Sequence, residues 1–288
     1  MKLLLTLFIF CISFSAFNQN WWESFDGDGV TDIDGNFYPT RVIRNVVYEQ
    51  EWMTRNLWTT RFSNGDSIQK IFPDFPISGI GSQIDTITTP VYANWDNDPA
   101  SVIPWGSFYN TLVVNDTRNV CPTGWHVPTK EEFDNLVDIV NSSGAHTRLK
   151  SNEYWIQSAG NNESGWTGLP SGKVDNPGFR YRGYRHYSWT STRGFASASS
   201  VNDSSNYVFR MNYDSGGVGT SCYNVPEWNL IPIRCIKGSL ANTTEIQIEK
   251  PTVVKILDLM GRETEFKPNV TLIYVYDDGT TKKVLKIE

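Results

Sequence analysis

The clearest pattern of apolar and polar positions lies between residues 129 and 140. Thr129 stands three residues before Glu132, a capping-box arrangement with which many helices begin. Apolar side chains then recur at intervals of three and four residues, so that one helical face is apolar: Phe133, Leu136, Val137 and Val140. The pattern predicts a helix that begins at Thr129 and ends near residues 141–144.

Short apolar runs separated by turns surround this helix. Residues 32–38 predict a turn, and residues 40–43, 46–48 and 51–53 predict short antiparallel strands. Residues 54–118 scatter five prolines among Gly, Asp and Asn, which indicates a long irregular segment that is either an insertion or a functional surface.

After the helix, segments rich in Trp, Tyr, Gly and Ser predict short strands and stiff loops: 165–170, 187–192, 207–211 and 230–236. Together with the single long helix, these segments predict an α+β domain with little helix and many short strands.

The composition changes again near the C-terminus. Residues 238–245 are typical of a linker, and four strand-like segments follow at 246–248, 253–258, 272–276 and 284–287. We therefore expect a small all-β unit over residues 246–288, of a size that is marginal for independent folding.

The overall composition fits a globular chain that does not bind nucleic acid. Of the 288 residues 39% are hydrophobic, which is enough for a sizeable core. The net charge is -6, and no run of basic residues supplies the positive surface that phosphate backbones require.

The first residues have the features of an export signal. A lysine at position 2 precedes an apolar run over residues 3–12, and small side chains follow, so residues 1–18 predict a cleavable signal peptide and residues 19–29 a short lead-in. Lipidation at Cys11 is disfavoured because the bulky Phe10 precedes it. No later stretch is long and apolar enough to span a membrane, and we expect a secreted or outer-surface protein.

Removal of the signal peptide leaves an odd number of cysteines, Cys121, Cys222 and Cys235. In an oxidising compartment an odd count indicates one thiol outside any disulfide. The spacing leaves three arrangements open, namely a Cys121–Cys235 bond, a Cys222–Cys235 bond, or three buried thiols.

Four aspartates near the start of the mature chain suggest a cation site. Asp26, Asp28, Asp32 and Asp34 alternate with other residues, as carboxylates do in calcium loops. The EF-hand pattern fails, however, because the required positions are occupied by other residue types. A polar Asp-Gly-Asn turn is the favoured interpretation, and Ca²⁺ stays an alternative for these four residues.

A second candidate site alternates aromatic rings with guanidinium groups: Arg180, Tyr181, Arg182, Tyr184 and Arg185. Sugars stack on such rings, and arginine can donate two hydrogen bonds to their hydroxyls or to carboxylates. These residues are our candidates for a ligand-binding surface. The three histidines are dispersed and do not indicate a catalytic or metal site.

Six motifs occur in the order seen in the Fibrobacter succinogenes major paralogous domain family, which the chain resembles over residues 30–237. The motifs are TDIDGNFY at 31–38, EWMTRNL at 51–57, CPTGWHVPTKEEF at 121–133, WTGLP at 166–170, SWTST at 188–192 and IRCI at 233–236.

The resemblance has implications for the fold and for the cysteines. The family looks related to the C-type-lectin-like fold of formylglycine-generating enzymes, in which a helix follows an Arg-Leu-Pro-Thr-like motif and an Arg-Cys strand closes the chain. It implies that Cys121 and Cys235 are disulfide partners. An oxidase of the formylglycine-generating kind would need two cysteines close together near the C-terminal end, and Cys222 and Cys235 are spaced too far apart.

The C-terminal unit resembles the type A sorting domain of the type IX secretion system of Bacteroidetes. The shared segments are VKILDLMGRE at 254–263, YVY at 274–276 and KKVL at 282–285, whereas PNVTL at 268–272 replaces the usual Pro-x-Gly-x-Tyr. This resemblance implies export across the outer membrane by that machinery.

Together, these features favour an exported, cell-surface or secreted protein that binds a glycan or a protein without catalysis and needs no cofactor. Two alternatives remain, a formylglycine-generating-enzyme-like oxidase and a structural envelope component.

Overall fold

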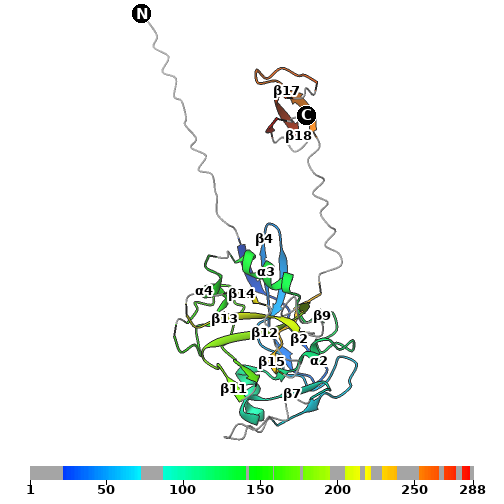
Figure 1. The fold of residues 1–288 in the computed structure, drawn as a ribbon, viewed down its shortest axis with the longest axis vertical. Helices are drawn as coiled ribbons and strands as arrows, with labels where there is room; N and C mark the ends of the chain where they lie inside the picture. Colours follow the sequence, from blue (N-terminus) through cyan, green and yellow to red (C-terminus); the bar gives the residue numbers. More distant parts are fainter. Residues whose placement is uncertain are drawn as a thin grey trace, which may run out of the picture. The chain divides into compact units, whose positions relative to one another are not determined.

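The computed structural model describes residues 22–72, 87–140, 143–157, 159–175, 178–194, 205–214, 218–221, 229–238, 253–265, 269–276 and 281–285. The chain forms two compact units, one up to Gly238 and one from Ser239, and each is described by itself (Figure 1). The predicted signal peptide, most of the predicted linker, and Cys222 lie outside the described residues.

The larger unit consists mostly of strands in several small sheets, with little helix, as the sequence predicted. Its largest sheet has five strands in the order β1-β4-β5-β16-β9. The bounds are β1 Trp22–Asp26, β4 Thr40–Asn45, β5 Glu49–Met53, β16 Ile236–Lys237 and β9 Trp125–His126. Strand β16, which comes late in the chain, therefore lies between β5 and β9 and pairs with both.

Two further sheets complete the frame of this unit. One has the order β15-β8-β7-β6 and the other the order β12-β13-β14. Their bounds are β15 Ile231–Pro232, β8 Phe108–Tyr109, β7 Val91–Ala93, β6 Gln69–Lys70, β12 Arg185–Gly194, β13 Ser205–Asn212 and β14 Val218–Ser221. Two hairpins are formed by β2 Val30–Thr31 with β3 Phe37–Tyr38, and by β10 Lys173–Asp175 with β11 Gly178–Arg180.

The predicted helix is confirmed as α3, Lys130–Ile139. Thr129 caps it and forms the capping box with Glu132, so that two backbone donors of the first turn are bonded. Its apolar face contains Phe133 and Leu136 as predicted, and also Ile139. The other helical segments are short: η2 Trp95–Asn97, η3 Pro99–Ser101, α1 Val102–Trp105, α2 Thr111–Val114 and α4 Ala145–Leu149.

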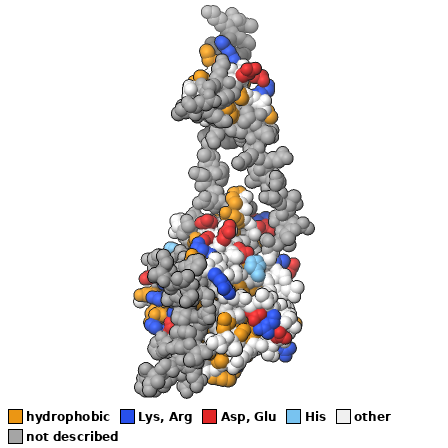
Figure 2. Space-filling model, turned by 45° about the vertical axis from the view of Figure 1, so that its right-hand side comes forward, with side chains coloured by type: hydrophobic (Ala, Val, Ile, Leu, Met, Phe, Trp, Pro, Cys, Tyr) orange, Lys and Arg blue, Asp and Glu red, His pale blue; other side chains and the backbone are white. Residues whose placement is uncertain are grey.

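The strand predicted at residues 46–48 is wrong. These residues form the turn between β4 and β5, where Val46 is 84% and Val47 69% exposed. The side-chain oxygen of Asn45 accepts hydrogen bonds from the backbone N–H groups of Val47 and Tyr48, at 2.8 Å each. This local asparagine turn outweighs the β-propensity of the two valines. Hydrophobic side chains stand out at this end of the larger unit in Figure 2.

The irregular segment predicted at residues 54–118 is wrong in part, because it contains three short strands and several helical turns. Strands β7 and β8 are buried along their whole length. Strands of two or three residues are too short to show an alternating pattern, and their partners in the sheet are distant in sequence. Only the tertiary pairing reveals them.

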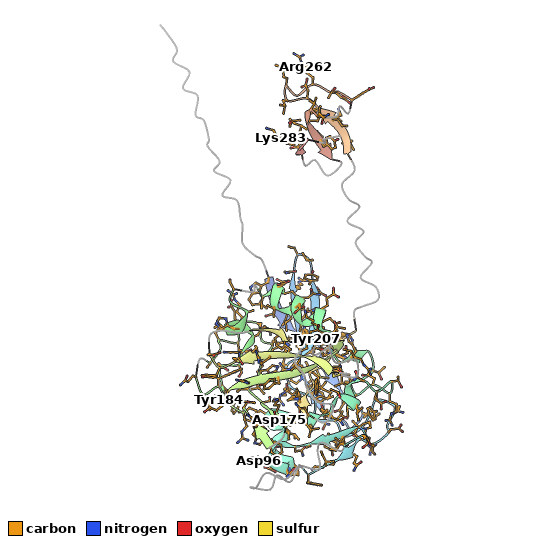
Figure 3. All side chains as sticks on the ribbon, in the orientation of Figure 1. Asp96, Asp175, Tyr184, Tyr207, Arg262 and Lys283 are labelled. Carbon is orange, nitrogen blue, oxygen red and sulfur yellow. A yellow bond between two sulfur atoms is a disulfide. The ribbon has the colours of Figure 1, made fainter. Side chains whose placement is uncertain are left out.

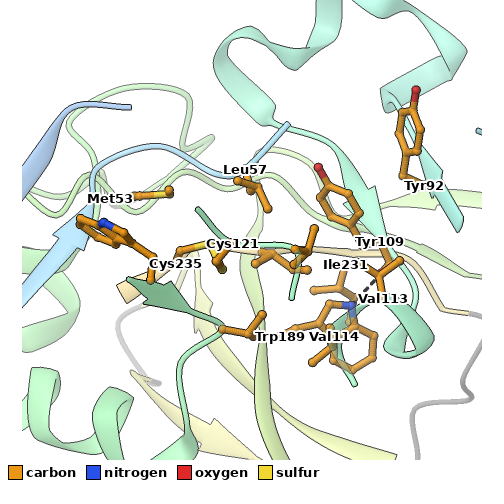
Figure 4. Close-up of a cluster of buried hydrophobic side chains, with 14 of the residues drawn as sticks. Met53, Leu57, Tyr92, Tyr109, Val113, Val114, Cys121, Trp189, Ile231 and Cys235 are labelled. Atoms are coloured by element: carbon orange, nitrogen blue, oxygen red, sulfur yellow. Dashed lines mark hydrogen bonds between the residues drawn. A yellow bond between two sulfur atoms is a disulfide. The ribbon is translucent and has the colours of Figure 1, made fainter. Parts of the chain in front are cut away.

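The disulfide Cys121–Cys235 lies in a large hydrophobic cluster of the larger unit (Figure 4). Both cysteines are fully buried, and the bond joins the segment before α3 to the segment between β15 and β16. In the same cluster the indole N–H of Trp189 donates to the carbonyl of Tyr109 at 2.7 Å. The structure thus contains the cysteine pair that the family resemblance implied. A second cluster packs the apolar face of α3 against Trp52, Trp166 and Phe209.

The smaller unit contains one antiparallel sheet in the order β17-β18-β19. Its strands are β17 Val253–Leu257, β18 Thr271–Tyr276 and β19 Thr281–Leu285, in agreement with three of the four predicted segments. The fourth, at residues 246–248, lies outside the described residues. No helix within the described ranges is long and apolar enough to cross a membrane.

Candidate functional site

Three of the sequence motifs meet at Arg234, whose side chain is fully buried. Its guanidinium donates to the side-chain oxygen of Asn56, at 3.0 Å from Nη2 and 3.3 Å from Nε. The same group donates to the backbone carbonyls of Trp166 and Thr167. It also lies over the Trp166 ring, with Cζ 4.1 Å from the ring centre. Arg234 therefore holds together segments that are far apart in sequence.

No carboxylate among the described residues pairs with Arg234. Burial lowers the pKa of its guanidinium to about 9. Three oxygen acceptors and the face of an indole ring offset the free-energy cost of removing this charge from water. This arrangement uses the guanidinium donors within the core, so Arg234 serves the fold rather than a ligand.

The Arg234 network reaches the surface through Asn56. The amide of Asn56 donates to the backbone carbonyl of Trp105 and to the hydroxyl of Ser171, each at 2.8 Å. Trp105 itself lies beneath Arg182, and the neighbours of Ser171, Pro170 and Gly172, form backbone hydrogen bonds with Gly183 and Arg185 of the candidate loop. The buried network thus fixes the backbone beneath that surface.

His186 lies beside Arg234 and is fully buried. Its Nδ1 is 2.8 Å from the carbonyl of Leu169, which can only accept, so Nδ1 carries the proton and Nε2 accepts from the hydroxyl of Ser188. Burial and the nearby charge of Arg234 lower the pKa of His186 to about 3. The imidazole is therefore neutral in the folded protein at neutral pH.

This shift predicts a pH dependence of folding stability. In the unfolded chain His186 takes up a proton below about pH 6.5, whereas the folded chain does so only near pH 3. The contribution of His186 to the free energy of unfolding is therefore complete above about pH 6.5. It falls by about 1.4 kcal/mol for each pH unit between these two values. Denaturant unfolding from pH 7 to pH 4 measures this slope.

The matched comparison is His186→Asn against His146→Asn, because His146 is only partly buried. The His186→Asn variant is expected to lose less stability on acidification than the parent protein, so the two curves converge as the pH falls. Parallel curves for the parent and His186→Asn would contradict a buried neutral histidine.

The candidate ligand-binding residues lie where β11 leads into β12. We call the surface formed by Trp95, Trp105, Tyr154, Arg182 and Tyr184 the arginine–aromatic face. Figure 3 labels Tyr184 and Asp96, the residue after Trp95, toward the same end of the larger unit. The contacts below connect Trp95, Trp105, Tyr154 and Arg182, and Tyr184 follows Arg182 by two residues in the same loop.

The backbone of this loop is tightly fixed. The carbonyl of Tyr181 accepts hydrogen bonds from the N–H groups of Tyr184 and Arg185, at 3.0 and 2.9 Å. Tyr181 has a φ of 66°, which a bulky residue rarely adopts, and Gly183 has a φ of 84°. The neighbouring Gly172 has no room for a side chain, because a Cβ there would lie 2.2 Å from the carbonyl oxygen of Arg180. The loop is therefore held in a single, closely packed turn.

Arg182 lies over two indole rings. Its Cζ is 4.6 Å from the centre of the Trp95 ring and 5.7 Å from that of Trp105. The side chain is exposed, whereas Trp95 is buried beneath it. Cation–π contact thus positions the guanidinium at the surface.

Two exposed tyrosines also belong to this face, one before Arg182 in the sequence and one after it. Tyr154 is 49% exposed and packs edge-on against Trp105, with ring centres 5.0 Å apart. Tyr184 is 43% exposed and packs edge-on against Tyr213 at 5.5 Å. Each ring has a fixed orientation and keeps exposed area that a flat ligand can cover.

The remaining predicted residues of the loop have other roles. The guanidinium groups of Arg180 and Arg185 both lie over the ring of Tyr181, with Cζ at 4.8 and 4.3 Å from its centre. Arg180 also lies 3.6 Å from the carboxylate of Asp175, which is bonded more closely to Lys173 at 2.6 Å. Arg180, Tyr181 and Arg185 thus form a stacked group that supports the loop.

The sequence did not identify Trp95, Trp105 and Tyr154 as part of this surface. Two of them lie in the segment that the sequence predicted to be irregular, and that segment was noted as a possible functional surface. Tryptophans beside Asn, Pro and Gly could have drawn attention to it, but only the fold shows that they pack against Arg182.

The four aspartates of the calcium hypothesis do not converge. Asp26 pairs with Arg41 at 2.5 Å. Asp32 accepts from the backbone of Asp34 and from the hydroxyl of Tyr38, so it caps the β2–β3 hairpin as the turn interpretation predicted. Asp34 accepts from Thr60, and Asp28 is exposed. Within the described part of the chain no three His, Cys, Asp or Glu side chains form a group that could hold a metal ion.

A cavity of about 200 Å³ opens beside this hairpin. It is lined by Val30, Thr31, Asp32, Ile33, Ser63, Pro122 and Thr123. Asp32 is the charged residue of this lining, and its carboxylate is already bonded on both oxygens by groups of its own hairpin. The one charged side chain of the cavity lining is therefore engaged within the protein.

His126 also has a structural partner. Its Nε2 lies 2.9 and 3.0 Å from the two carboxylate oxygens of Glu132, the residue that completes the capping box of α3. The hydrogen bonds from His126 and Thr129 outweigh the effect of burial and lower the pKa of Glu132. The pair secures the start of the helix.

Comparison with known proteins gives one match. A family model of the Fibrobacter succinogenes major domain matches residues 47–237, which is more than half of the chain. No curated protein and no solved structure matches the chain. The matched region contains the Arg234 network, the disulfide and the whole arginine–aromatic face. The chain belongs to the Fibrobacter succinogenes major domain family.

Proposed function

We propose that this protein is a non-catalytic binding module that recognises a glycan through the arginine–aromatic face. The observation that carries the proposal is the pair of half-exposed tyrosines, Tyr154 and Tyr184, each held edge-on by a second aromatic ring. Rings with a fixed orientation lose little conformational entropy when a sugar stacks on them. The closely packed loop that carries Tyr184 adds to this preorganisation.

The cysteines support a binding role over thiol oxidation. Cys235 is bonded to Cys121 inside a hydrophobic cluster, so a dithiol site that used Cys235 would first require this bond to be opened. A disulfide that closes the last strand onto the segment before α3 also fits the C-type-lectin-like fold, which we include in the proposal. In such a fold, loops on a small scaffold are the usual place for ligands.

We further infer that the protein is exported, by a signal peptide at residues 1–18 and by type IX secretion, to the outer surface or the medium. The C-terminal unit supports this through the turn that follows β17. The carboxylate of Asp258 accepts hydrogen bonds from the backbone of Met260 and Arg262, at 2.8 and 2.9 Å. Leu259 and Met260 are exposed on this turn. Apolar side chains displayed on a tight turn suit recognition by a partner such as the secretion machinery.

The binding proposal is tested with the double variant Tyr154→Ala/Tyr184→Ala. Loss of both rings is expected to weaken glycan binding by about thirtyfold, because each stacked ring contributes of the order of 1 kcal/mol. Affinity electrophoresis in gels that contain a set of soluble polysaccharides measures the change.

The matched control is Tyr48→Ala, which removes an exposed tyrosine from the β4–β5 turn, at the other end of the larger unit from β11 in Figure 1. It is expected to bind as the parent protein does. The proposed function would be overturned if none of the polysaccharides retarded the parent protein. It would also be overturned if Tyr48→Ala weakened binding as much as Tyr154→Ala/Tyr184→Ala does.

A further inference from the structure

The geometry points to an acidic glycan, one that carries carboxylate or sulfate groups, as the ligand of the arginine–aromatic face, with Arg182 as the group that binds the anion. This inference rests on the proposed glycan-binding function and adds the class of ligand. It depends on the unused donors of Arg182, on the two rings that hold it, and on the local charge.

The donors of Arg182 are available to a ligand. Within the described residues no hydrogen bond or ion pair engages its guanidinium, although the side chain is exposed at the surface. Other surface arginines of the same unit donate to carboxylates, as Arg41 does to Asp26 and Arg118 to Asp116. An arginine held away from carboxylates retains the fork geometry that matches a carboxylate or sulfate.

The two tryptophans position this guanidinium before a ligand arrives. Its Cζ lies 4.6 and 5.7 Å from the centres of the Trp95 and Trp105 rings, and cation–π contact leaves the N–H groups able to donate to an anion. The backbone of Trp105 is in turn bonded to the buried Asn56 at 2.8 Å. The anion-binding group is therefore connected through packed side chains to the core of the domain, which reduces the entropy lost on binding.

The loop that carries Arg182 is positively charged although the chain as a whole is acidic, and the exposed carboxylates of Asp96 and Glu153 adjoin Trp95 and Tyr154 in the sequence. Residues 178–188 contain three arginines and no acidic residue. The closest acidic partner of the loop, Asp175, is already paired with Lys173 and Arg180. Because salt screens charges beyond about 8 Å in physiological conditions, these neighbouring groups decide whether an anion binds.

The exposed tyrosines place a sugar ring next to the bound anion. Tyr154 packs on Trp105, which itself lies beneath Arg182. An acidic group on Arg182 therefore brings the pyranose that carries it, or the next one along the chain, toward the ring of Tyr154. A neutral sugar could use the tyrosine but would leave the guanidinium without its acceptor.

The experiment compares matched polysaccharides on the full chain by affinity electrophoresis. Polygalacturonate is compared with its methyl-esterified form, and dextran sulfate with dextran, so the two pairs separate carboxylate from sulfate as the recognised anion. We expect at least about tenfold tighter binding to the acidic member of one or both pairs, with weaker binding as salt rises. Arg182→Gln is expected to abolish most of that preference, and Arg182→Lys to retain part of it.

The control variant is Arg193→Gln, which makes the same charge change at an exposed arginine near the far end of β12. It lies eight positions along the strand from Arg185, or about 25 Å. It is expected to bind as the parent protein does. Thermal unfolding checks that Arg182→Gln remains folded, which its exposed position favours.

Three results would overturn the inference, and they differ in what they mean for the proposed function. In the first, the neutral and acidic polysaccharides bind equally, and binding is unaffected by Arg182→Gln but lost in Tyr154→Ala/Tyr184→Ala. This result would reject an acidic ligand and retain the proposal of glycan binding. Failure to bind any polysaccharide removes both. Equally tight binding of polyglutamate shows that any polyanion suffices, or that an acidic protein is the ligand.

Discussion

Replacing both Cys121 and Cys235 by alanine is expected to lower the free energy of unfolding by about 4 to 5 kcal/mol. The disulfide joins residues 114 positions apart, so its loss frees a long loop in the unfolded chain. Both sulfur atoms are buried, and their removal also leaves unfilled space in a hydrophobic cluster. A loss of this size is a large share of the stability of an ordinary domain.

Denaturant unfolding of the parent and the double variant measures this loss. Every protein in the series carries Cys222→Ser, so that the third cysteine cannot substitute for a partner, and Cys222→Ser alone is the control. Unfolding of the same parent chain after reduction gives the effect of the crosslink without any change of side chain. A difference below about 1 kcal/mol in both comparisons would show that the bond contributes little to this fold.

Arg234→Met is expected to lower the free energy of unfolding by about 3 to 5 kcal/mol. The variant leaves the side-chain oxygen of Asn56 and the carbonyls of Trp166 and Thr167 buried without their donor. Each such acceptor costs about 1 to 3 kcal/mol. Because burial disfavours the charged form of Arg234, replacing it by an uncharged side chain offsets part of this cost. The lost acceptor bonds are the larger effect because three groups lose their partner at once.

Two further variants make this test specific. Arg234→Lys keeps a charge but has no planar fork, so it cannot reach three acceptors on different segments and is expected to recover only part of the loss. Arg193→Met removes an exposed arginine and is expected to change stability by less than about 0.5 kcal/mol. Equal stability of Arg234→Met and the parent protein would contradict a central role for the guanidinium.

These two predictions concern the same part of the molecule. Cys235 and Arg234 are adjacent in the chain, and one anchors the last strand to the segment before α3 while the other anchors it to Asn56 and Trp166. The motifs that indicate the family therefore meet mainly in the core. Function has to be sought at the surface that this core supports.

Several features followed from the sequence because they depend on neighbouring residues. Helix α3 was predicted from its capping box and apolar spacing, both of which act within a few residues. The β2–β3 turn was predicted from an Asp-Gly-Asn segment, and Asp32 caps it through its own hairpin. The three described strands of the C-terminal unit followed from their apolar runs.

Other features depended on the tertiary structure. Residues 46–48 have strand-like side chains, but the side chain of Asn45 and the pairing of β4 with β5 place them in a turn. Strands β7 and β8 are too short for a pattern and exist because distant segments pair with them. Local propensity is a weak preference that such pairing overrides.

By itself, the sequence determined the secondary structure with local signals and the compositional division of the chain, and it suggested the arginine-rich loop as a candidate ligand site. The tertiary structure decided that Arg234 is a buried cation and that Arg182 is an exposed one, although both lie over tryptophan rings. It also decided that Trp95, Trp105 and Tyr154 join Arg182 on one surface. Burial and contact between distant segments are properties of the packed chain, and no short sequence pattern contains them.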